Sequence, residues 1–200
     1  KPMIMSTGMS DLAEVETAVT TLGEAGNRQV ALLQCVSNYP ADPANANLRA
    51  MDTMERKFSV PVGYSDHTPG IAVAVAAAAL GATVIEKHFT LDCSLPGPDH
   101  GASLEPHELE AMVKGIRTAQ MALGTGEKRP ADSEKGTADV ARKSLVAAKD
   151  IPAGTVLTED LIAIKRPGTG LPPAMRTDLV GKSMRAPITA GVLFKLEMLS

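Results

Sequence analysis

Two histidines occupy similar places in the sequence, each directly after an apolar, strand-like run. His67 lies in GYSDHT and His88 lies in VIEKHFT. If the two runs are neighbouring parallel strands, their carboxyl ends meet at one rim, and both imidazoles can bind one ion. Two imidazoles leave coordination positions for water or a substrate oxygen, which suits a catalytic divalent cation such as Mn²⁺. The alternative interpretation is a pair of ordinary rim histidines without a metal.

Carboxylates stand close to these histidines in the sequence. Glu86 precedes His88 by two residues, so on a strand it points to the same side. We expect it to orient a ligand or to act as an acid or base, unless it is paired with a lysine. Lys87 points the other way, and we interpret it as structural. The stiff Pro-Gly-Pro turn before Asp99 would project that carboxylate toward the same rim, although an ordinary loop has the same composition.

Hydroxyl groups also gather at the predicted strand ends. Ser6, Ser37 and Ser65 each follow an apolar run, where hydroxyls and loop amides can bind a phosphate or carboxylate. Serine is common in loops, but the three together suggest an anionic substrate. In the C-terminal part, Arg166 of KRPGTG could make a two-pronged contact with a polar ligand or belong to a solvated basic turn. Asp66 is interpreted as an exposed polar residue.

The elements that must position these residues follow a repeating pattern. Apolar strand-like runs alternate four times with segments whose apolar residues recur every three to four positions. We expect strands over 2–5, 30–36, 60–64 and 83–89, and helices over 12–22, 47–58, 70–80 and 105–123. Ser10 or Asp11 can cap the first helix. Such alternation implies parallel strands with right-handed crossovers, in an open sheet or a barrel.

The composition and the apolar periodicity of the sequence change after residue 123. Residues 124–142 are polar and charged and contain Gly and Pro, so they are interpreted as a linker. Beyond them, short strands are expected over 144–148, 161–165 and 182–186. The pattern Ile-x-Ala-Gly-x-x-apolar begins at both Ile151 and Ile188, which suggests a pseudo-twofold β-rich module. A module of about sixty residues is marginally stable by itself.

Composition restricts the class of partner. The formal net charge is −3, with 44% hydrophobic and 22% charged residues, which is typical of a globular protein. No sustained Lys/Arg run indicates nucleic acid or an anionic membrane surface, so small molecules are the expected partners. The longest apolar run, 71–80, is too short to cross a bilayer. Cys35 and Cys93 suggest no disulfide framework, so we expect a cytoplasmic location. Because the chain begins with Lys1, we expect it to be a piece of a longer protein.

The segments that carry these residues resemble the sialic acid synthase family, which includes legionaminic and pseudaminic acid synthases. The resemblance runs in collinear order over nearly the whole chain, in STGMSDLAEVETAV, LLQCVSNYP, NLRAMDTM, VGYSDHTPG, VIEKHFTLD, PGPDH and IKRPGTG. In this family a (β/α)₈ TIM barrel precedes an antifreeze-like (SAF) domain. The resemblance therefore implies an α/β fold, with the last four β/α units of the barrel in 1–123, a linker in 124–142 and the SAF domain in 143–200. The first four strands would be missing, so we expect the chain alone to be inactive.

The resemblance also implies a reaction and roles for individual residues. The family condenses phosphoenolpyruvate with an N-acetylated amino sugar, such as N-acetylmannosamine or a dideoxy diamino sugar, and releases phosphate. The product is a nine-carbon 2-keto acid, and the cofactor is a divalent metal, usually Mn²⁺, with Mg²⁺ or Co²⁺ as alternatives. The partner subunit of a domain-swapped homodimer would deliver an arginine. The implied roles are metal binding by His67 and His88, phosphoenolpyruvate binding by Ser6, Ser37 and Ser65, catalysis by Glu86 and Asp99, and sugar binding by Tyr39, Asp99 and Arg166.

Two other classes of function remain open from the residues themselves. A noncatalytic protein could use the C-terminal module to bind a carbohydrate or an assembly partner, which predicts no metal dependence and no effect of His67→Ala. A different barrel aldolase or lyase could act on a sugar phosphate, which predicts a Schiff-base lysine. No lysine is clearly placed at an inward-pointing strand end. We therefore favour the synthase interpretation.

Overall fold

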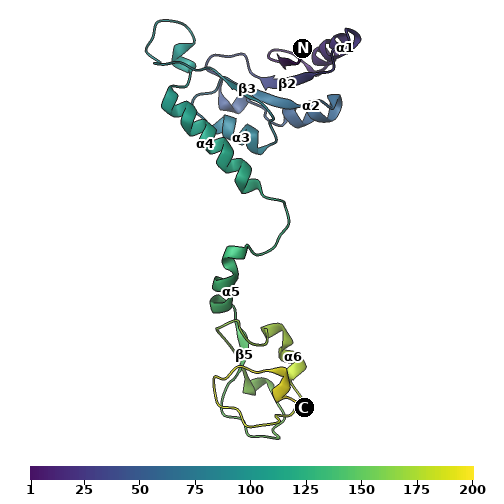
Figure 1. Ribbon diagram of the computed structural model, residues 1–200, viewed down its shortest axis with the longest axis vertical. Coiled ribbons are helices and arrows are strands. Elements are labelled where there is room, and N and C mark those ends of the chain that lie inside the picture. The colour runs from purple at the N-terminus through teal and green to yellow at the C-terminus, as the bar shows by residue number, and fades with distance from the viewer. The chain divides into compact units, whose positions relative to one another are not determined.

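Four short parallel strands form the sheet of the N-terminal part. They are β1 (Met3–Ser6), β2 (Val30–Cys35), β3 (Val62–Asp66) and β4 (Ile85–Lys87), and they lie in the order β1-β2-β3-β4. The computed structural model describes residues 1–200, which divide into two compact units, Lys1–Glu127 and Lys128–Ser200. The sequential order of parallel strands in the first unit confirms the predicted β-α alternation, and the sheet is curled (Figure 1).

The helices of the first unit cover one face of this sheet. They are α1 (Leu12–Glu24), α2 (Ala50–Phe58), α3 (Ala72–Ala79) and α4 (Pro106–Leu123). Apolar residues of α1, α2 and α3 form one buried cluster with the strand residues Leu32 and Tyr64, and α4 packs beside α3. Asp11 is the cap of α1, because its Oδ1 accepts hydrogen bonds from the backbone N–H groups of Ala13 and Glu14.

The opposite face of the sheet carries the polar side chains that the sequence singled out. Cys35 pairs with Ser65, and Ser65 pairs with Glu86 in the strand register. Because side chains alternate along a strand, these residues point away from the face that Leu32 and Tyr64 share with the helices. We call this second face the open face; its side chains include Ile4, Ser6, Leu33, Cys35, Ser65 and Glu86, of which Leu33 is buried. Ile4 is 58% exposed there.

The last strand is shorter than the predicted span of 83–89. Thr83 still donates its backbone N–H to Val62, but after Lys87 the chain leaves β3. Leu104 donates its backbone N–H to the His88 carbonyl, and Phe89 forms an isolated bridge with Leu104. The predicted end of β4 therefore pairs with the segment before α4 instead of with β3.

The second unit contains little regular secondary structure. Its strands β5 (Ser144–Ala147) and β6 (Ile162–Lys165) are antiparallel, and its helices are α5 (Lys135–Ala141) and α6 (Arg176–Leu179). The predicted strand over 182–186 is wrong, since Met184 makes only an isolated bridge to Leu199. Pro187 has no N–H with which to continue a ladder there. Short 3₁₀ turns occur in the chain at Pro43–Asn45, His100–Ala102, Asp132–Glu134, Glu159–Leu161, Pro173–Met175 and Leu196–Met198.

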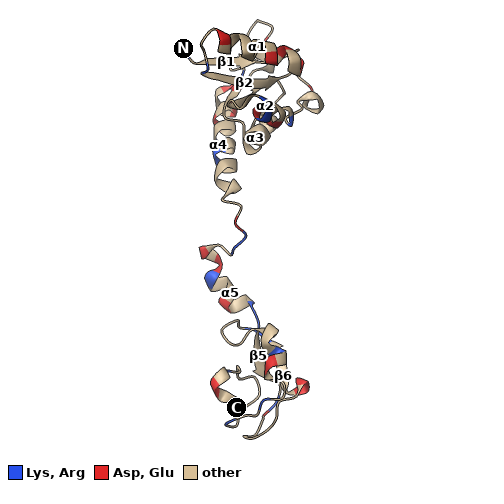
Figure 2. Ribbon diagram, turned by 90° about the vertical axis from the view of Figure 1, so that its right-hand side faces the viewer, with Lys and Arg blue, Asp and Glu red and all other residues tan.

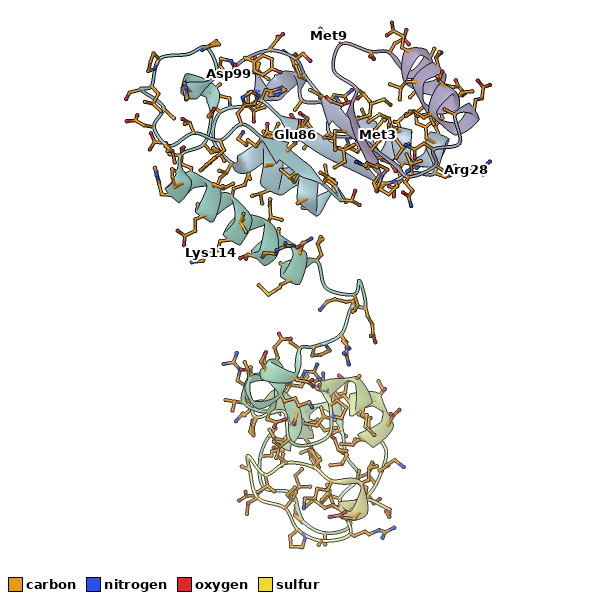
Figure 3. All side chains as sticks on the ribbon, turned by 45° about the horizontal axis from the view of Figure 1, so that its top comes forward. Met3, Met9, Arg28, Glu86, Asp99 and Lys114 are labelled. Atoms are coloured by element: carbon orange, nitrogen blue, oxygen red, sulfur yellow. The ribbon has the colours of Figure 1, made fainter.

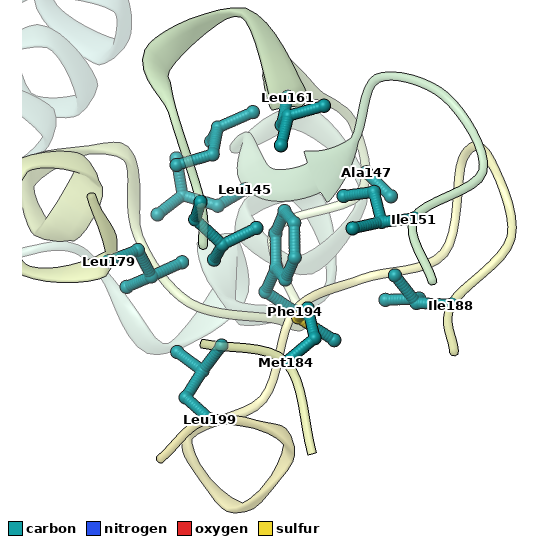
Figure 4. Packing of buried hydrophobic residues seen from close by; sticks show 11 residues of the cluster. Leu145, Ala147, Ile151, Leu161, Leu179, Met184, Ile188, Phe194 and Leu199 are labelled. Atoms are coloured by element: carbon teal, nitrogen blue, oxygen red, sulfur yellow. The ribbon is translucent and has the colours of Figure 1, made fainter. Parts of the chain in front are cut away.

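The internal repeat of the second unit has a structural counterpart. Ile151 and Ile188 are the first residues of the two copies. The backbone N–H of each donates a hydrogen bond to the carbonyl of the other, at 2.8 and 3.0 Å. Leu157 and Phe194, the last residues of the two copies, are both 0% exposed. Figure 4 shows Phe194 among the side chains of this core. The two copies therefore take equivalent places in one core, as the pseudo-twofold interpretation requires.

Part of the predicted linker is folded. Within 124–142, the structure contains a 3₁₀ turn and α5. The backbone N–H of Gly168 donates to Asp139 at 2.7 Å, and Arg166 Nε donates to the Ala141 carbonyl at 3.1 Å. These bonds tie α5 to the second unit, so only the earlier residues of the predicted linker lack a helix.

Acidic and basic residues are interspersed in both units (Figure 2). None of the helices combines the length and the apolar character needed to span a membrane.

Candidate active site

The carboxyl ends of β3 and β4, with the loop after β2, bring together five of the predicted site residues: Ser65, Glu86, His67, His88 and Tyr39. Ser65 Oγ donates a hydrogen bond to Glu86 Oε1 at 2.7 Å. The rings of His67 and His88 lie 5.2 Å apart between centroids, and the Tyr39 ring lies 4.2 Å from His67 and 5.4 Å from His88. We call these five residues the rim cluster. Figure 3 labels Glu86 on the sheet.

His67 is held firmly by the backbone around it. Its Nδ1 lies 2.8 Å from the carbonyl oxygen of Val36. A carbonyl oxygen only accepts hydrogen bonds, so Nδ1 must carry the hydrogen, and Nε2 of the neutral ring keeps a free electron pair. The His67 carbonyl in turn accepts a hydrogen bond from the backbone N–H of Ala41 at 2.8 Å. The ring is therefore oriented as metal-binding histidines usually are.

The two histidines fit a divalent cation that has other ligands besides protein. His88 is half-buried, and its ring makes no hydrogen bond within the chain. No group of three or more His, Cys, Asp or Glu side chains is arranged to hold an ion. The chain thus offers two imidazoles at most, and oxygen ligands from water or substrate would have to complete the coordination shell.

The predicted serines lie at the same edge of the sheet but in different surroundings. Ser6 is exposed at the carboxyl end of β1. Gly8 approaches Ser37 so closely that a Cβ added at Gly8 would lie 2.1 Å from Ser37 Oγ. The turn after β1 therefore packs directly on the loop after β2. The hydroxyl hydrogen of Ser65 is donated to Glu86, so it is not available to an anion while that bond lasts.

Two predicted site residues, Asp99 and Arg166, are not members of the rim cluster. Asp99, labelled in Figure 3, is exposed just before the 3₁₀ turn that precedes α4, and its carboxylate makes no hydrogen bond or ion pair with the cluster. The Ser103 hydroxyl donates to the Asp99 carbonyl at 2.7 Å and stabilises this turn. Arg166 belongs to the second unit and is exposed there. The roles predicted for Asp99 and Arg166 remain predictions.

The surroundings of Asp66 differ from those expected from the sequence. We expected an exposed residue, but its side chain is 0% exposed and its Oδ2 lies 2.8 Å from Nζ of Lys87, which is 2% exposed. Alternation was the available signal, because Asp66 shares the helix-covered face with Tyr64, two residues earlier. A charged residue on that face requires a partner, and Lys87 is on the same face of the neighbouring strand.

A separate cavity lies on the helix-covered side of the sheet. It has a volume of about 360 Å³ and is lined by residues of α1, α2 and the ends of β1 and β2, including Gln34, Arg49 and Thr53. None of the predicted site residues lines it. Cys35 of the open face also lines the cavity, and its thiol lies 3.7 Å from His67 Nδ1, so the cavity reaches the same edge of the sheet as the candidate active site.

Histidines, a carboxylate and hydroxyls at the carboxyl ends of parallel strands are the arrangement found in α/β enzymes. Comparison with known families specifies the class further. The NeuB family matches residues 1–128, and the SAF domain matches residues 142–200. The chain therefore belongs to the NeuB family.

Individual relatives agree with this assignment. The chain is 44% identical over 200 residues to N,N'-diacetyllegionaminic acid synthase of Legionella pneumophila, covering 98% of this chain and 56% of the relative. It is 41% identical over 186 residues to N-acetylneuraminate-9-phosphate synthase of Mus musculus, covering 92% and 52%. A crystal structure of N-acetylneuraminic acid synthetase from Leptospira borgpetersenii matches with a TM-score of 0.62 and 40% identity, over 68% of this chain and 47% of that one. The chain spans about half the length of these relatives.

Proposed function

We propose that this chain supplies part of the active site of a synthase that condenses phosphoenolpyruvate with an N-acetylated amino sugar. The products would be a nine-carbon 2-keto acid and phosphate. The observation that carries the proposal is the juxtaposition of His67 and His88 beside the Ser65–Glu86 pair at one edge of a parallel sheet. The names of the relatives, which are synthases of legionaminic acid and N-acetylneuraminate 9-phosphate, support this class of reaction.

His67 and His88 would hold a divalent cation, for which Mn²⁺ is our first choice. When bound, such an ion would polarise a carbonyl oxygen and make its carbon more electrophilic. The hydrogen bond from His67 Nδ1 to the Val36 carbonyl selects the tautomer of the neutral ring in which Nε2 carries the free electron pair that would bind the ion. The Tyr39 ring stacks obliquely on His67 and limits how that imidazole can rotate.

Glu86 would move a proton at the reacting centre. Its Oε1 is fixed by the Ser65 hydroxyl, while its Oε2 makes no hydrogen bond within the chain. A carboxylate with one anchored oxygen and one open oxygen can accept a proton from water and return it without losing its orientation. Ser6 and Ser37, from the neighbouring strand ends, would donate hydrogen bonds to the carboxylate or phosphate of phosphoenolpyruvate.

Residues outside the rim cluster would complete the site from other parts of the protein. We propose that Asp99 approaches the sugar through the loop before α4, and that Arg166 reaches the sugar of a partner subunit in a domain-swapped homodimer. We also propose that the four strands are the last four of a closed (β/α)₈ barrel. Exposed Ile4 on the open face supports this, since a closed barrel would bury such a side chain.

The proposed function can be tested by measuring phosphate release from phosphoenolpyruvate with Mn²⁺ and a panel of N-acetyl amino sugars. The assay is run on this chain and on the full product of its gene. We expect metal-dependent release by the full product, a loss of at least about 10³-fold in His67→Ala and in His88→Ala, and no release by the chain alone. His107→Ala, which changes an exposed histidine on α4, is the matched control. Absence of release with every sugar from a folded full product would overturn the proposal.

A further inference from the structure

Asp66 and Lys87 form a fully buried ion pair on the helix-covered face of the sheet. Asp66 Oδ2 and Lys87 Nζ are 2.8 Å apart, and the two side chains are 0% and 2% exposed. Each member immediately precedes one of the two histidines, since His67 follows Asp66 and His88 follows Lys87. The pair is therefore one residue from both proposed metal ligands, but on the opposite face of the sheet.

The pair belongs to a ladder of consecutive contacts between β3 and β4. Ser65 pairs with Glu86 in the strand register, and their side chains are hydrogen-bonded on the open face. The next step pairs Asp66 with Lys87, whose side chains join on the helix-covered face. The two histidine rings follow, 5.2 Å apart on the side of Ser65 and Glu86. The same alignment of the strands produces all three contacts.

The length and the apolar pattern of β4 define this alignment weakly, so it depends on specific contacts, which include the Ser65–Glu86 hydrogen bond and the close fit of Gly63 against Val84. The strand has only three residues, Ile85–Lys87. A slip by two residues would leave every side chain on its own face, so the apolar pattern alone does not prevent it. Such a slip would shift one histidine by about 7 Å along the strands relative to the other. It would also leave the charges of Asp66 and Lys87 buried without partners, which is strongly unfavourable.

The same pair fixes the backbone on the far side of His67. Asp66 Oδ1 accepts hydrogen bonds from the backbone N–H and the hydroxyl of Thr68 at 2.9 and 2.8 Å. Lys87 Nζ donates to the Thr68 carbonyl at 2.6 Å. Both chain neighbours of His67 are thus held by the ion pair, and one of them is held from the strand that leads into His88.

We propose that Asp66 and Lys87 are positioning residues, which set the register of β3 and β4 that places His67 beside His88. The inference rests on the proposed function, because it concerns how the two proposed metal ligands are brought together. A positioning role of the Asp66–Lys87 pair differs in one respect from a role that only stabilises the fold. A variant that loses both charges avoids the cost of burying one charge without a partner. It still lacks the contact that favours the native register over a shifted one.

The test compares Lys87→Met with the double variant Asp66→Asn/Lys87→Met, in the full product of the gene. Three quantities are measured: the melting temperature, Mn²⁺ binding by electron paramagnetic resonance, and the backbone contacts between Ser65 and Glu86 by NMR. We expect the double variant to melt above Lys87→Met, to bind Mn²⁺ at least about tenfold more weakly than the wild type, and to lose the wild-type contacts. Lys57→Met, which breaks the exposed pair with Glu16, should leave Mn²⁺ binding unchanged.

The outcomes separate this inference from the proposed function. A double variant that keeps the Ser65–Glu86 contacts, or that loses less than tenfold in Mn²⁺ affinity relative to a wild type that binds the ion, overturns the positioning role. A wild type that binds no Mn²⁺ contradicts the metal site of the proposed function instead. In that case the NMR contacts between Ser65 and Glu86 alone decide whether the ion pair sets the register. If the double variant retains these contacts, the positioning role of the ion pair is overturned.

Discussion

Single hydrogen bonds decide what the rim cluster can do. The Ser65 hydroxyl is committed to Glu86, and the carboxylate is thereby fixed on the open face next to the two imidazoles. Ser65 is only 2% exposed, so no water competes freely for this bond. At this scale the serine is better placed to orient Glu86 than to bind an anion itself. We therefore propose a different role for Ser65 from the anion binding that we propose for Ser6 and Ser37.

Ser65→Ala tests that distinction. If Ser65 orients Glu86, we expect kcat to fall by about 10–100-fold with little change in the KM for phosphoenolpyruvate, because a misplaced proton-transfer group slows the chemical step. Steady-state kinetics of the full product measure both constants. Ser94→Ala is the control, since Ser94 donates to Asp92 at 2.6 Å in an exposed loop. A raised KM at unchanged kcat would instead indicate that Ser65 binds the substrate.

Tyr64 carries a buried hydroxyl that has no hydrogen-bond partner in the structure. Burial, with the nearby charge of Asp66 as a second cause, raises the pKa of Tyr64 to about 12. The unfolded chain would release this proton near pH 10. The group therefore contributes its full stability below pH 10, and this contribution is lost as the pH rises from about 10 through 12.

Tyr64→Phe should remove that alkaline loss of stability. We expect the variant to be as stable as the wild type at pH 7, or more stable by up to about 1 kcal/mol, because no hydrogen bond is given up. Urea denaturation at pH 7 and between pH 10 and 12 checks both points. Tyr39→Phe, at an exposed tyrosine, should keep the wild-type pH dependence. A clear loss of stability in Tyr64→Phe at pH 7 would show that the hydroxyl has a partner.

At the scale of elements, the close approach of β3 and β4 requires a glycine. A Cβ added at Gly63 would lie 2.2 Å from the Val84 carbonyl oxygen and 2.8 Å from Leu33 Cδ2. Neither atom can move away easily, because the Val84 carbonyl accepts a hydrogen bond from the backbone N–H of Tyr64, and the Leu33 side chain is 0% exposed. The strand spacing that supports the histidine pair therefore depends on the absence of a side chain at this position.

Gly63→Ala should destabilise the protein by about 1–3 kcal/mol, as is usual for overpacked interiors. Gly23→Ala is a matched control in α1, where nothing lies within 4 Å of the added Cβ. That change should stabilise the helix by up to about 1 kcal/mol, since alanine has the higher helix propensity. Urea denaturation of both variants gives the comparison. Equal stability of the two would contradict the proposed steric role of Gly63.

In the molecule as a whole, each of the two units has hydrophobic clusters of its own. The second unit encloses its own hydrophobic cluster, in which Leu145, Leu157 and Phe194 are all 0% exposed. A unit of this size is expected to have modest stability, so a single cavity in its core should matter. We therefore expect Lys128–Ser200 to unfold in a cooperative transition of its own.

Phe194→Ala should lower the stability of the second unit by about 3–5 kcal/mol, the usual effect of removing a buried aromatic ring. Amide hydrogen exchange of the full chain would show this as lost protection in residues 144–199 with unchanged protection in β2 and β3. Val192→Ala, at a side chain that is 41% exposed, is the control. Equal loss of protection in both units would show that they unfold together.

Much of the first unit could be predicted from periodicity. Apolar runs of four to seven residues, separated by segments with helical spacing, fix both the type and the order of the elements. The sites at the strand ends follow from this order, and five predicted residues do form one cluster. The less regular second unit was predicted less well. The expected strand over 182–186 is only a set of isolated bridges, and the end of the expected linker is helical.

The order of the strands, and the face that each side chain takes along a strand, can be worked out from the amino-acid sequence, because alternation is a local property of the backbone. The strand pairs and their register depend on contacts between residues distant in the chain, and so required the folded structure. Asp66 and Lys87 are twenty-one positions apart, and although alternation places each of them on the helix-covered face, nothing local brings the two side chains together. Their ion pair, and with it the placement of His67 beside His88, exists only once β3 and β4 are aligned.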